Sequence, residues 1–199
     1  MTYHYAEKSA PPGAPLLMTF HGTGGDETQF HDLAATIRPD ARVISARGDV
    51  SERGANRFFK RTGEGVYDMA DLALRADAMA GFVAEQKAAQ GASTVMGFGY
   101  SNGANILAAI MLKYPQLFDR AAWLHPLIPW APAPQPGLKG ARVLISAGRR
   151  DPICPAPLTQ ALVDYVKDQQ SDVTLLWHEG GHEIHRSEVD ALATFLAAD

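Results

Sequence analysis

The sequence predicts an α/β protein with a mostly parallel sheet and helices on both faces. Six short, uninterrupted apolar runs alternate with segments whose apolar residues recur at helical spacing. A strand that is apolar at consecutive positions is buried on both faces, which is typical of a parallel sheet between helices. The 199 residues suffice for one sizeable core, so a single domain over 1–199 is expected. After six strands and their helices, little chain remains for a large lid domain.

Each element has its own signal. Asp26 and Gln29 have capping-box spacing ahead of an i, i+3, i+4, i+7 apolar pattern, and Pro39 ends that helix. The predicted strands are residues 16–20, 42–45, 94–98, 121–124, 143–147 and 173–177, with 3–5 as an edge strand. The predicted helices are residues 26–37, 69 to about 91, 102–113, 158–166 and 184–196, and a long glycine-marked connection spans 47–65.

Composition and charge exclude several classes of function. Eighteen basic and 22 acidic residues give a net charge of −4, which provides no electrostatic footprint for nucleic acid or an anionic membrane. The single cysteine, Cys154, excludes an internal disulfide framework and a cysteine-based zinc finger. The uncharged stretches 88–112 and 121–138 are broken by glycines and prolines, so no membrane span is expected. The first residues lack the pattern of a secretory signal, which predicts a cytoplasmic location.

Polar residues directly follow the predicted strands. In an open parallel sheet, chemistry gathers at the carboxyl ends of the strands, so these residues are the candidates for a site. They are His21-Gly22-Thr23, Ser101, His125, Asp151 and the segment from His178 to His185.

The motif G-x-S-x-G spans Gly99 to Gly103, directly after a predicted strand and directly before a predicted helix. A tight strand-to-helix turn needs small residues two places either side of the serine. It lifts the Ser101 hydroxyl out of the sheet, above the positive end of the helix. We therefore interpret Ser101 as a nucleophile. The alternative is a glycine-rich turn in which the serine only caps the helix.

A serine nucleophile needs a histidine base and a carboxylate that orients this base, in the chain order Ser, acid, His. Asp151 follows the fifth predicted strand and is the candidate acid, although it could instead cap a helix before Pro152. His182 is the favoured base because the glycines before it free its loop to fold back toward the serine. His178 and His185 are the alternatives.

The segment from His178 to His182 also matches H-E-x-x-H, the motif of zinc proteases. That motif needs a continuous helix to bring both histidines to one face. Here the segment follows a strand and contains Gly180 and Gly181, each of which costs about 1 kcal/mol in a helix. The sequence contains no P-loop and no complete dinucleotide fingerprint, so we expect neither a metal nor an organic cofactor.

An acyl-transfer site also needs two backbone N–H donors for the oxyanion. The N–H of Asn102, directly after the nucleophile, is one candidate. The N–H of Thr23, in the glycine-rich loop from His21 to Gly25, is the other. A glycine-rich anion-binding turn is the alternative interpretation of that loop.

Four segments, HGTGGDE at 21–27, GFGYSNG at 97–103, DP at 151–152 and GH at 181–182, occur in a characteristic order and spacing. Together they resemble the phospholipase/carboxylesterase family of α/β-hydrolases, which also contains the acyl-protein thioesterases. The match runs over nearly the whole chain. The segments RFFKR at 57–61 and GVYD at 65–68 resemble the small bacterial carboxylesterase branch of this family.

The resemblance implies an α/β-hydrolase fold without a large lid, acting on carboxylic esters or thioesters. Members are often dimers, so a homodimer is implied. His125 and Pro126 depart from the family, because the thioesterases usually have a Ser-Gly pair there, and this weakens any transfer of a thioesterase preference. The positions carried over from the family are Ser101, Asp151 and His182 for the triad and Thr23 and Asn102 for the oxyanion donors.

The pocket is expected where two loops leave the catalytic edge of the sheet. Phe58 and Phe59 lie in the long connection and Trp130 in the proline-rich loop, and we expect these three side chains to wall an apolar pocket. Ordinary packing onto the core is the alternative. The basic residues of 57–61 are expected to be solvated or ion-paired rather than to bind a substrate carboxylate.

We therefore predict a serine hydrolase that cleaves small to medium carboxylic esters through an acyl-enzyme on Ser101. Within enzymes, the alternative is an acyl-protein thioesterase or a lysophospholipase-like lipase with a long acyl channel. The alternative that is not an enzyme is a non-catalytic ligand-binding homologue, since a fold alone does not establish a function. The expected partner is a small-molecule ester.

Overall fold

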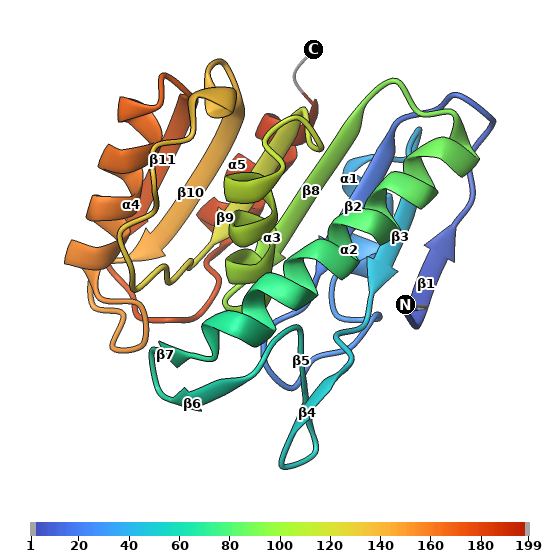
Figure 1. Ribbon diagram of the computed structural model, residues 1–199. Helices are drawn as coiled ribbons and strands as arrows, with labels where there is room; N and C mark the ends of the chain where they lie inside the picture. The colour runs from blue at the N-terminus through green and yellow to red at the C-terminus, as the bar shows by residue number, and fades with distance from the viewer. Residues whose placement is uncertain (1–2, 198–199) are drawn as a thin grey trace.

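The computed structural model describes residues 3–197, which are organised around a seven-stranded sheet (Figure 1). Its strand order is β1-β3-β2-β8-β9-β10-β11; β1 runs antiparallel to β3, and the other neighbouring pairs are parallel. The edge strand begins at Tyr5, not at the predicted residue 3. The strands are β1 (Tyr5–Lys8), β2 (Leu16–Phe20), β3 (Arg42–Ala46), β8 (Val95–Tyr100), β9 (Arg120–Leu124), β10 (Arg142–Gly148) and β11 (Asp172–His178).

Helices cover both faces of the sheet, which confirms the predicted fold class. Figure 1 shows α2, α3 and α4 in front of the sheet and α1 and α5 behind it. The part of the chain that the structure describes contains no large lid domain. None of its helices is both long enough and apolar enough to cross a membrane. The helices are α1 (His31–Ile37), α2 (Met69–Gln90), α3 (Asn102–Lys113), α4 (Ala156–Asp168) and α5 (Arg186–Ala197), with a short 3₁₀ turn at Pro136–Leu138.

The core consists of two apolar layers, one on each side of the sheet. Side chains alternate between the two faces along a strand. β2 therefore sends Leu16, Met18 and Phe20 toward α2 and α3, and Leu17 toward α1 and α5. Burying each such side chain contributes about 1.5–3 kcal/mol relative to leaving it exposed. The two layers hold rigid the strand ends that carry the candidate residues.

The helix predicted from residue 26 begins five residues later, at His31. The Asp26 carboxylate accepts hydrogen bonds from Thr28 N at 2.8 Å and Thr28 Oγ1 at 2.6 Å, which makes a turn of its own. The side-chain oxygen of Gln29 accepts from Gly22 N at 2.8 Å. The polar residues that suggested a capping box therefore fix the glycine-rich loop after β2.

The long connection predicted over 47–65 folds into two hairpins. β4 (Val50–Glu52) pairs with β5 (Ala55–Arg57), and β6 (Arg61–Gly63) pairs with β7 (Val66–Tyr67), both antiparallel. Figure 1 shows the hairpins below the sheet, at the end where the parallel strands finish. They stand at the edge where an open α/β sheet places its functional residues.

We expect Gly103→Ala to lower the free energy of unfolding by about 1–3 kcal/mol, the usual effect of overpacking. A Cβ at this position of α3 would overlap the carbonyl oxygens of Phe20 and His21, and backbone atoms cannot give way as a flexible side chain can. Gly81→Ala in α2 is the matched control, because nothing lies within 4 Å of its added Cβ. It should stabilise the protein by about 0.5–1 kcal/mol. Urea unfolding measures both changes, and equal midpoints for the two variants would contradict this steric account.

Candidate active site

Ser101 occupies a strained turn between β8 and α3. Its backbone has φ 52° and ψ −116°, a region that residues with a Cβ rarely adopt. Its N–H donates to Leu124 O at 2.9 Å, which ties the turn to the end of β9. A Cβ at Gly99 would overlap the backbone of Gly103, and a Cβ at Gly103 would overlap the carbonyl oxygens of Phe20 and His21, so neither position has room for a side chain. The turn has the strand-to-helix setting that the G-x-S-x-G spacing predicts.

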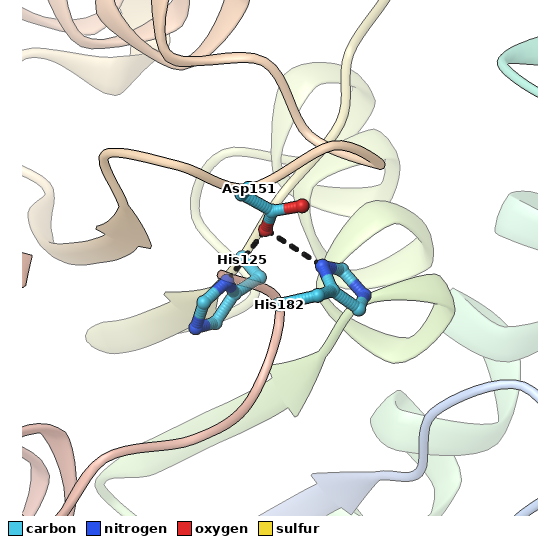
Figure 2. Close-up of side chains that lie close together, drawn as sticks. All are labelled: His125, Asp151 and His182. Carbon is cyan, nitrogen blue, oxygen red and sulfur yellow. Dashed lines mark hydrogen bonds and ion pairs between the residues drawn. The ribbon is translucent and has the colours of Figure 1, made fainter. Parts of the chain in front are cut away.

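Ser101, His182 and Asp151 form an unbroken line of hydrogen-bonding atoms. Ser101 Oγ lies 2.9 Å from His182 Nε2. On the other side of the ring, His182 Nδ1 lies 2.7 Å from Asp151 Oδ2, the contact that Figure 2 shows. His182 comes from the loop between β11 and α5. Tyr100 OH donates to the carbonyl oxygen of His182 at 2.6 Å, so the last residue of β8 holds this loop beside the serine.

Asp151 uses both carboxylate oxygens. Oδ1 accepts from the N–H groups of Ile153 at 2.8 Å and Cys154 at 2.9 Å, so the carboxylate also caps the turn that precedes α4. Oδ2 lies 2.7 Å from His182 Nδ1 and 2.8 Å from His125 Nδ1 (Figure 2). Burial opposes the ionised form, but the hydrogen bonds outweigh burial and lower the pKa of Asp151.

The two other downstream histidines have different partners. The rings of His178 and His185 stack on each other with centroids 3.8 Å apart. His178 Nε2 lies 3.2 Å from Glu188 Oε2, and His185 Nε2 lies 3.0 Å from Glu183 Oε1. Of the three candidate bases, His182 is the one in hydrogen-bond contact with the serine hydroxyl.

The H-E-x-x-H segment is not helical. His178 is the last residue of β11, and residues 179–185 form an irregular loop before α5. The helical geometry that a zinc protease needs is therefore missing from this segment.

Among residues 3–197, two sets of three side chains offer ligand atoms within 4.8 Å of one another, and both sets include His125. The first adds Asp151 and His182. Its nitrogen–oxygen distances are 2.7 and 2.8 Å, which are hydrogen-bond lengths. Ligand atoms around a tetrahedral zinc lie about 3.3 Å apart, given metal–ligand bonds of about 2.0–2.1 Å.

The second set joins His125 to His178 and Glu188. Gly180 N–H donates to His178 Nδ1 at 3.0 Å, so a neutral His178 carries its proton on Nε2, which faces Glu188. Burial lowers the pKa of His178, in agreement with a neutral ring. Hydrogen bonds thus account for the arrangement of both sets.

Within residues 3–197, the backbone N–H groups of Thr23 and Asn102 donate to no acceptor. The N–H groups on either side of Thr23 are engaged. Gly22 N donates to the Gln29 side chain at 2.8 Å, and Gly24 N donates to a backbone carbonyl at 2.9 Å. Thr23 and Asn102 both line the cavity beside Ser101, so their N–H groups are available to a ligand there.

The segment after β4 braces both residues that carry these donors. Arg57 Nη1 donates to Thr23 Oγ1 at 2.7 Å, and Phe58 N donates to Asn102 Oδ1 at 2.7 Å. Arg57 is buried and lies 3.4 Å from a carboxylate oxygen of Glu52. It is therefore ion-paired, as expected, but it is not a solvated surface residue.

A cavity of about 300 Å³ opens beside Ser101. Its lining combines apolar side chains with charged and amide groups. Cys154 is among the apolar contacts, and burial raises the pKa of its thiol, so it remains protonated and unreactive. The lining residues are Thr23, Arg57, Arg61, Glu64, Gly65, Tyr67, Tyr100, Ser101, Asn102, Asn105, Leu127, Ile153, Cys154 and His182.

The structure corrects the expected pocket wall, because this lining contains neither Phe58, Phe59 nor Trp130. The two phenylalanines are almost completely buried in the core. Phe58 packs edge-on to Phe20 with centroids 5.6 Å apart, and Phe59 packs against Tyr67 at 4.8 Å. The alternative of ordinary core packing therefore holds for the two phenylalanines. Trp130 lines two other cavities.

Glu188 was not predicted from the sequence to belong to the site, and His125 was a candidate there without a role. Glu188 is completely buried, although it lies on a helix where a solvated carboxylate is usual. It precedes the core residues Leu192 and Leu196 by four and eight positions, so it shares their face of α5. A glutamate on the apolar stripe of an amphipathic helix is the signal that could have identified it.

Comparison with known proteins gives several relatives of nearly full length. No family model matches the chain. MhqD of Bacillus subtilis, a hydrolase by name, is 35% identical over 189 residues, which cover 94% of each chain. The structure of Atu2452 from Agrobacterium tumefaciens, a protein of unknown function, is 50% identical with a TM-score of 0.92, covering 98% of this chain and 96% of that one. The Bacillus cereus carboxylesterase structure is 32% identical with a TM-score of 0.89, covering 97% and 92%.

We expect a chelator to change neither the thermal unfolding midpoint nor the turnover of an ester. The reason is that His125, His178 and Glu188 already satisfy one another through hydrogen bonds, so no metal bond would be lost. Dialysis against EDTA, followed by elemental analysis and thermal unfolding, measures this. One equivalent of zinc per chain, with loss of stability on its removal, would contradict the expectation.

Proposed function

The chain belongs to the phospholipase/carboxylesterase family of α/β-hydrolases and is an esterase-type enzyme, and on this premise we propose that it cleaves small carboxylic esters through an acyl-enzyme on Ser101. The observation that supports the proposal is the line of contacts from Ser101 Oγ to His182 at 2.9 Å and on to Asp151 at 2.7 Å. In this proposal Ser101 is the nucleophile, His182 the general base and acid, and Asp151 the group that orients His182.

In the first half-reaction, Ser101 Oγ attacks the ester carbonyl carbon while His182 Nε2 takes the hydroxyl proton. Nε2 is free to accept because Nδ1 of the neutral ring donates to Asp151. The tetrahedral intermediate then collapses, the bond to the alcohol oxygen breaks, and the alcohol leaves with the proton from His182. The ionised Asp151 stabilises the imidazolium that exists between these two transfers.

In the second half-reaction, water attacks the acyl carbon and gives its proton to His182. The bond between the acyl carbon and Ser101 Oγ breaks, and the serine recovers its proton from the imidazolium. The products are a carboxylic acid and an alcohol, and the protein returns to its starting state. The chain's own side chains supply every proton transfer in this cycle.

The negative charge that develops on the carbonyl oxygen needs fixed donors. We assign this role to the N–H groups of Thr23 and Asn102, which have no acceptor within residues 3–197. Asn102 is also the first residue of α3, so the positive end of the helix dipole favours the same charge.

The size of the cavity favours a small ester. A volume of about 300 Å³ lies at the lower end of the range of about 300–1,000 Å³ that ligand pockets span. Leu127 and Ile153 provide apolar contact for a short acyl chain, whereas the charged Arg61 and Glu64 limit the apolar area. A long-chain acyl group would have to extend beyond this cavity, which disfavours the lipase and thioesterase alternatives.

Ser101→Ala should abolish ester hydrolysis while leaving the fold intact. Loss of a triad nucleophile costs on the order of 10⁶-fold in kcat, because the residues of such a unit act together. Steady-state hydrolysis of p-nitrophenyl acetate measures the loss, and circular dichroism checks the fold. Ser187→Ala, on the exposed face of α5, is the control and should keep wild-type turnover.

A fluorophosphonate probe distinguishes a catalytic protein from a binding protein on the same fold. The probe should attach covalently to Ser101 in the wild type and in Ser187→Ala, but not in Ser101→Ala. A folded wild-type protein that neither reacts with the probe nor hydrolyses any ester in a broad library would favour the non-catalytic alternative.

The specificity constant should rise with acyl length and then fall once the chain exceeds the cavity. Each methylene that fits contributes about 0.8 kcal/mol, or about fourfold in kcat/KM. A series of p-nitrophenyl esters from acetate to palmitate measures the profile. Leu127→Ala enlarges the cavity and should move the maximum to a longer chain. A steady rise through palmitate would instead support the long-channel lipase or thioesterase.

A further inference from the structure

We infer that His125 is a positioning residue of this site, a buried imidazolium that joins Asp151 to Glu188 and thereby fixes the carboxylate that orients His182. The inference rests on the proposed function for its catalytic consequence, but the state of His125 can be measured independently of catalysis. Figure 2 shows Asp151 between the two rings, in contact with His125 on one side and His182 on the other.

Both ring nitrogens of His125 face carboxylates. Nδ1 lies 2.8 Å from Asp151 Oδ2, and Nε2 lies 3.1 Å from Glu188 Oε1. The side chains of all three residues are inaccessible to solvent, so water cannot replace either contact. A buried carboxylate requires donors or an opposite charge, and His125 is the residue placed to serve both carboxylates.

The other contacts of the two acids indicate that both are ionised. Glu188 accepts from Ser146 Oγ at 2.6 Å and from His185 N at 2.7 Å, in addition to the two histidine contacts. Asp151 accepts two backbone N–H groups through Oδ1. Because both acids act as acceptors throughout, a neutral imidazole could donate to only one of them. His125 must carry a proton on each nitrogen to satisfy both.

The electrostatics agree with this geometry. Burial opposes the charged form of His125, but the hydrogen bonds to Glu188 and Asp151 outweigh it and raise its pKa. Burial likewise opposes ionised Glu188, but the hydrogen bonds from His125 and Ser146 outweigh it and lower its pKa. The titratable groups that face His125 are Asp151, Glu188, His178, His182, Tyr100 and Cys154.

The charges that His125 contacts come from its two acidic neighbours, Asp151 and Glu188. Burial raises the pKa of Tyr100 to about 12 and also raises that of the Cys154 thiol, so both stay protonated. The bond from Gly180 N keeps His178 in its neutral form. The buried set of Asp151, Glu188 and imidazolium therefore has a net charge of −1, which the proton on His182 neutralises during turnover.

The backbone of His125 is held as firmly as its ring. Its φ is 51°, a conformation that residues with a Cβ adopt only where the surroundings impose it. His125 N donates to Ser146 O at 2.8 Å, and its carbonyl oxygen accepts from Cys154 Sγ at 3.2 Å. The ring is thereby fixed between the ends of β9 and β10, where it stops Asp151 from turning away from His182.

The first test is nitrogen NMR of histidine-labelled protein. His125 should carry protons on both ring nitrogens at pH values where a free imidazole is neutral, and Glu188→Gln should remove the second proton in that range. Glu188→Gln is nearly isosteric and leaves Asp151 untouched, so it isolates the charge. A neutral His125 in the wild type at those pH values would overturn the inference.

The second test is kinetic. His125→Asn, chosen because asparagine tolerates positive φ, should lower kcat roughly 10- to 100-fold and leave KM nearly unchanged, because Asp151 orients the base without touching the substrate. Glu188→Gln should lose less activity, since a neutral His125 can keep its Nδ1–H on Asp151. Wild-type kcat in a folded His125→Asn protein would overturn the positioning role. If the wild type shows no esterase activity, the proposed function fails, whereas NMR still decides the state of His125.

Discussion

One oxygen atom, Oδ2 of Asp151, connects the parts of this site. It faces His182 Nδ1 at 2.7 Å and His125 Nδ1 at 2.8 Å, while Oδ1 accepts two backbone N–H groups. Asp151 follows β10, and β10 lies between β9 and β11 in the sheet. His125 follows β9, and His182 follows β11. Three neighbouring strand ends therefore converge on one carboxylate. Because a buried carboxylate is unfavourable without donors, the position of Asp151 and the placement of both histidines depend on each other.

The same contacts couple the stability of the fold to pH. Asp151 and Glu188 have lowered pKa values, so their contribution is present above their unfolded values near about pH 4 and is lost as the pH falls through the folded values. His125 has a raised pKa, so its contribution is complete below about pH 6.5 and is lost as the pH rises through its folded value. All three contributions are complete together between about pH 4 and pH 6.5.

Local signals in the sequence predicted the sheet, the G-x-S-x-G turn and the order of serine, acid and histidine, because each depends on neighbouring residues or on strand order. The predicted start of α1 was wrong because capping-box spacing also fits a turn. Asp26 makes such a turn with Thr28. Glu188 was missed because its partner, His125, is 63 positions away and no local pattern records that pairing. Phe58 was misplaced because its position in the chain predicts the sheet edge but not the direction of its side chain.

The burial of Phe58 gives the hairpins a different role from the one that their sequence suggested. Its ring packs against Phe20 and His21, and this anchors the segment whose backbone N–H reaches Asn102 Oδ1. Arg57, the preceding residue of this segment, donates a hydrogen bond to the hydroxyl oxygen of Thr23. The aromatic residue therefore lies beneath the site and not in the pocket wall. By anchoring this one segment in the core, Phe58 helps to fix Thr23 and Asn102, the two residues to which we assign the oxyanion donors.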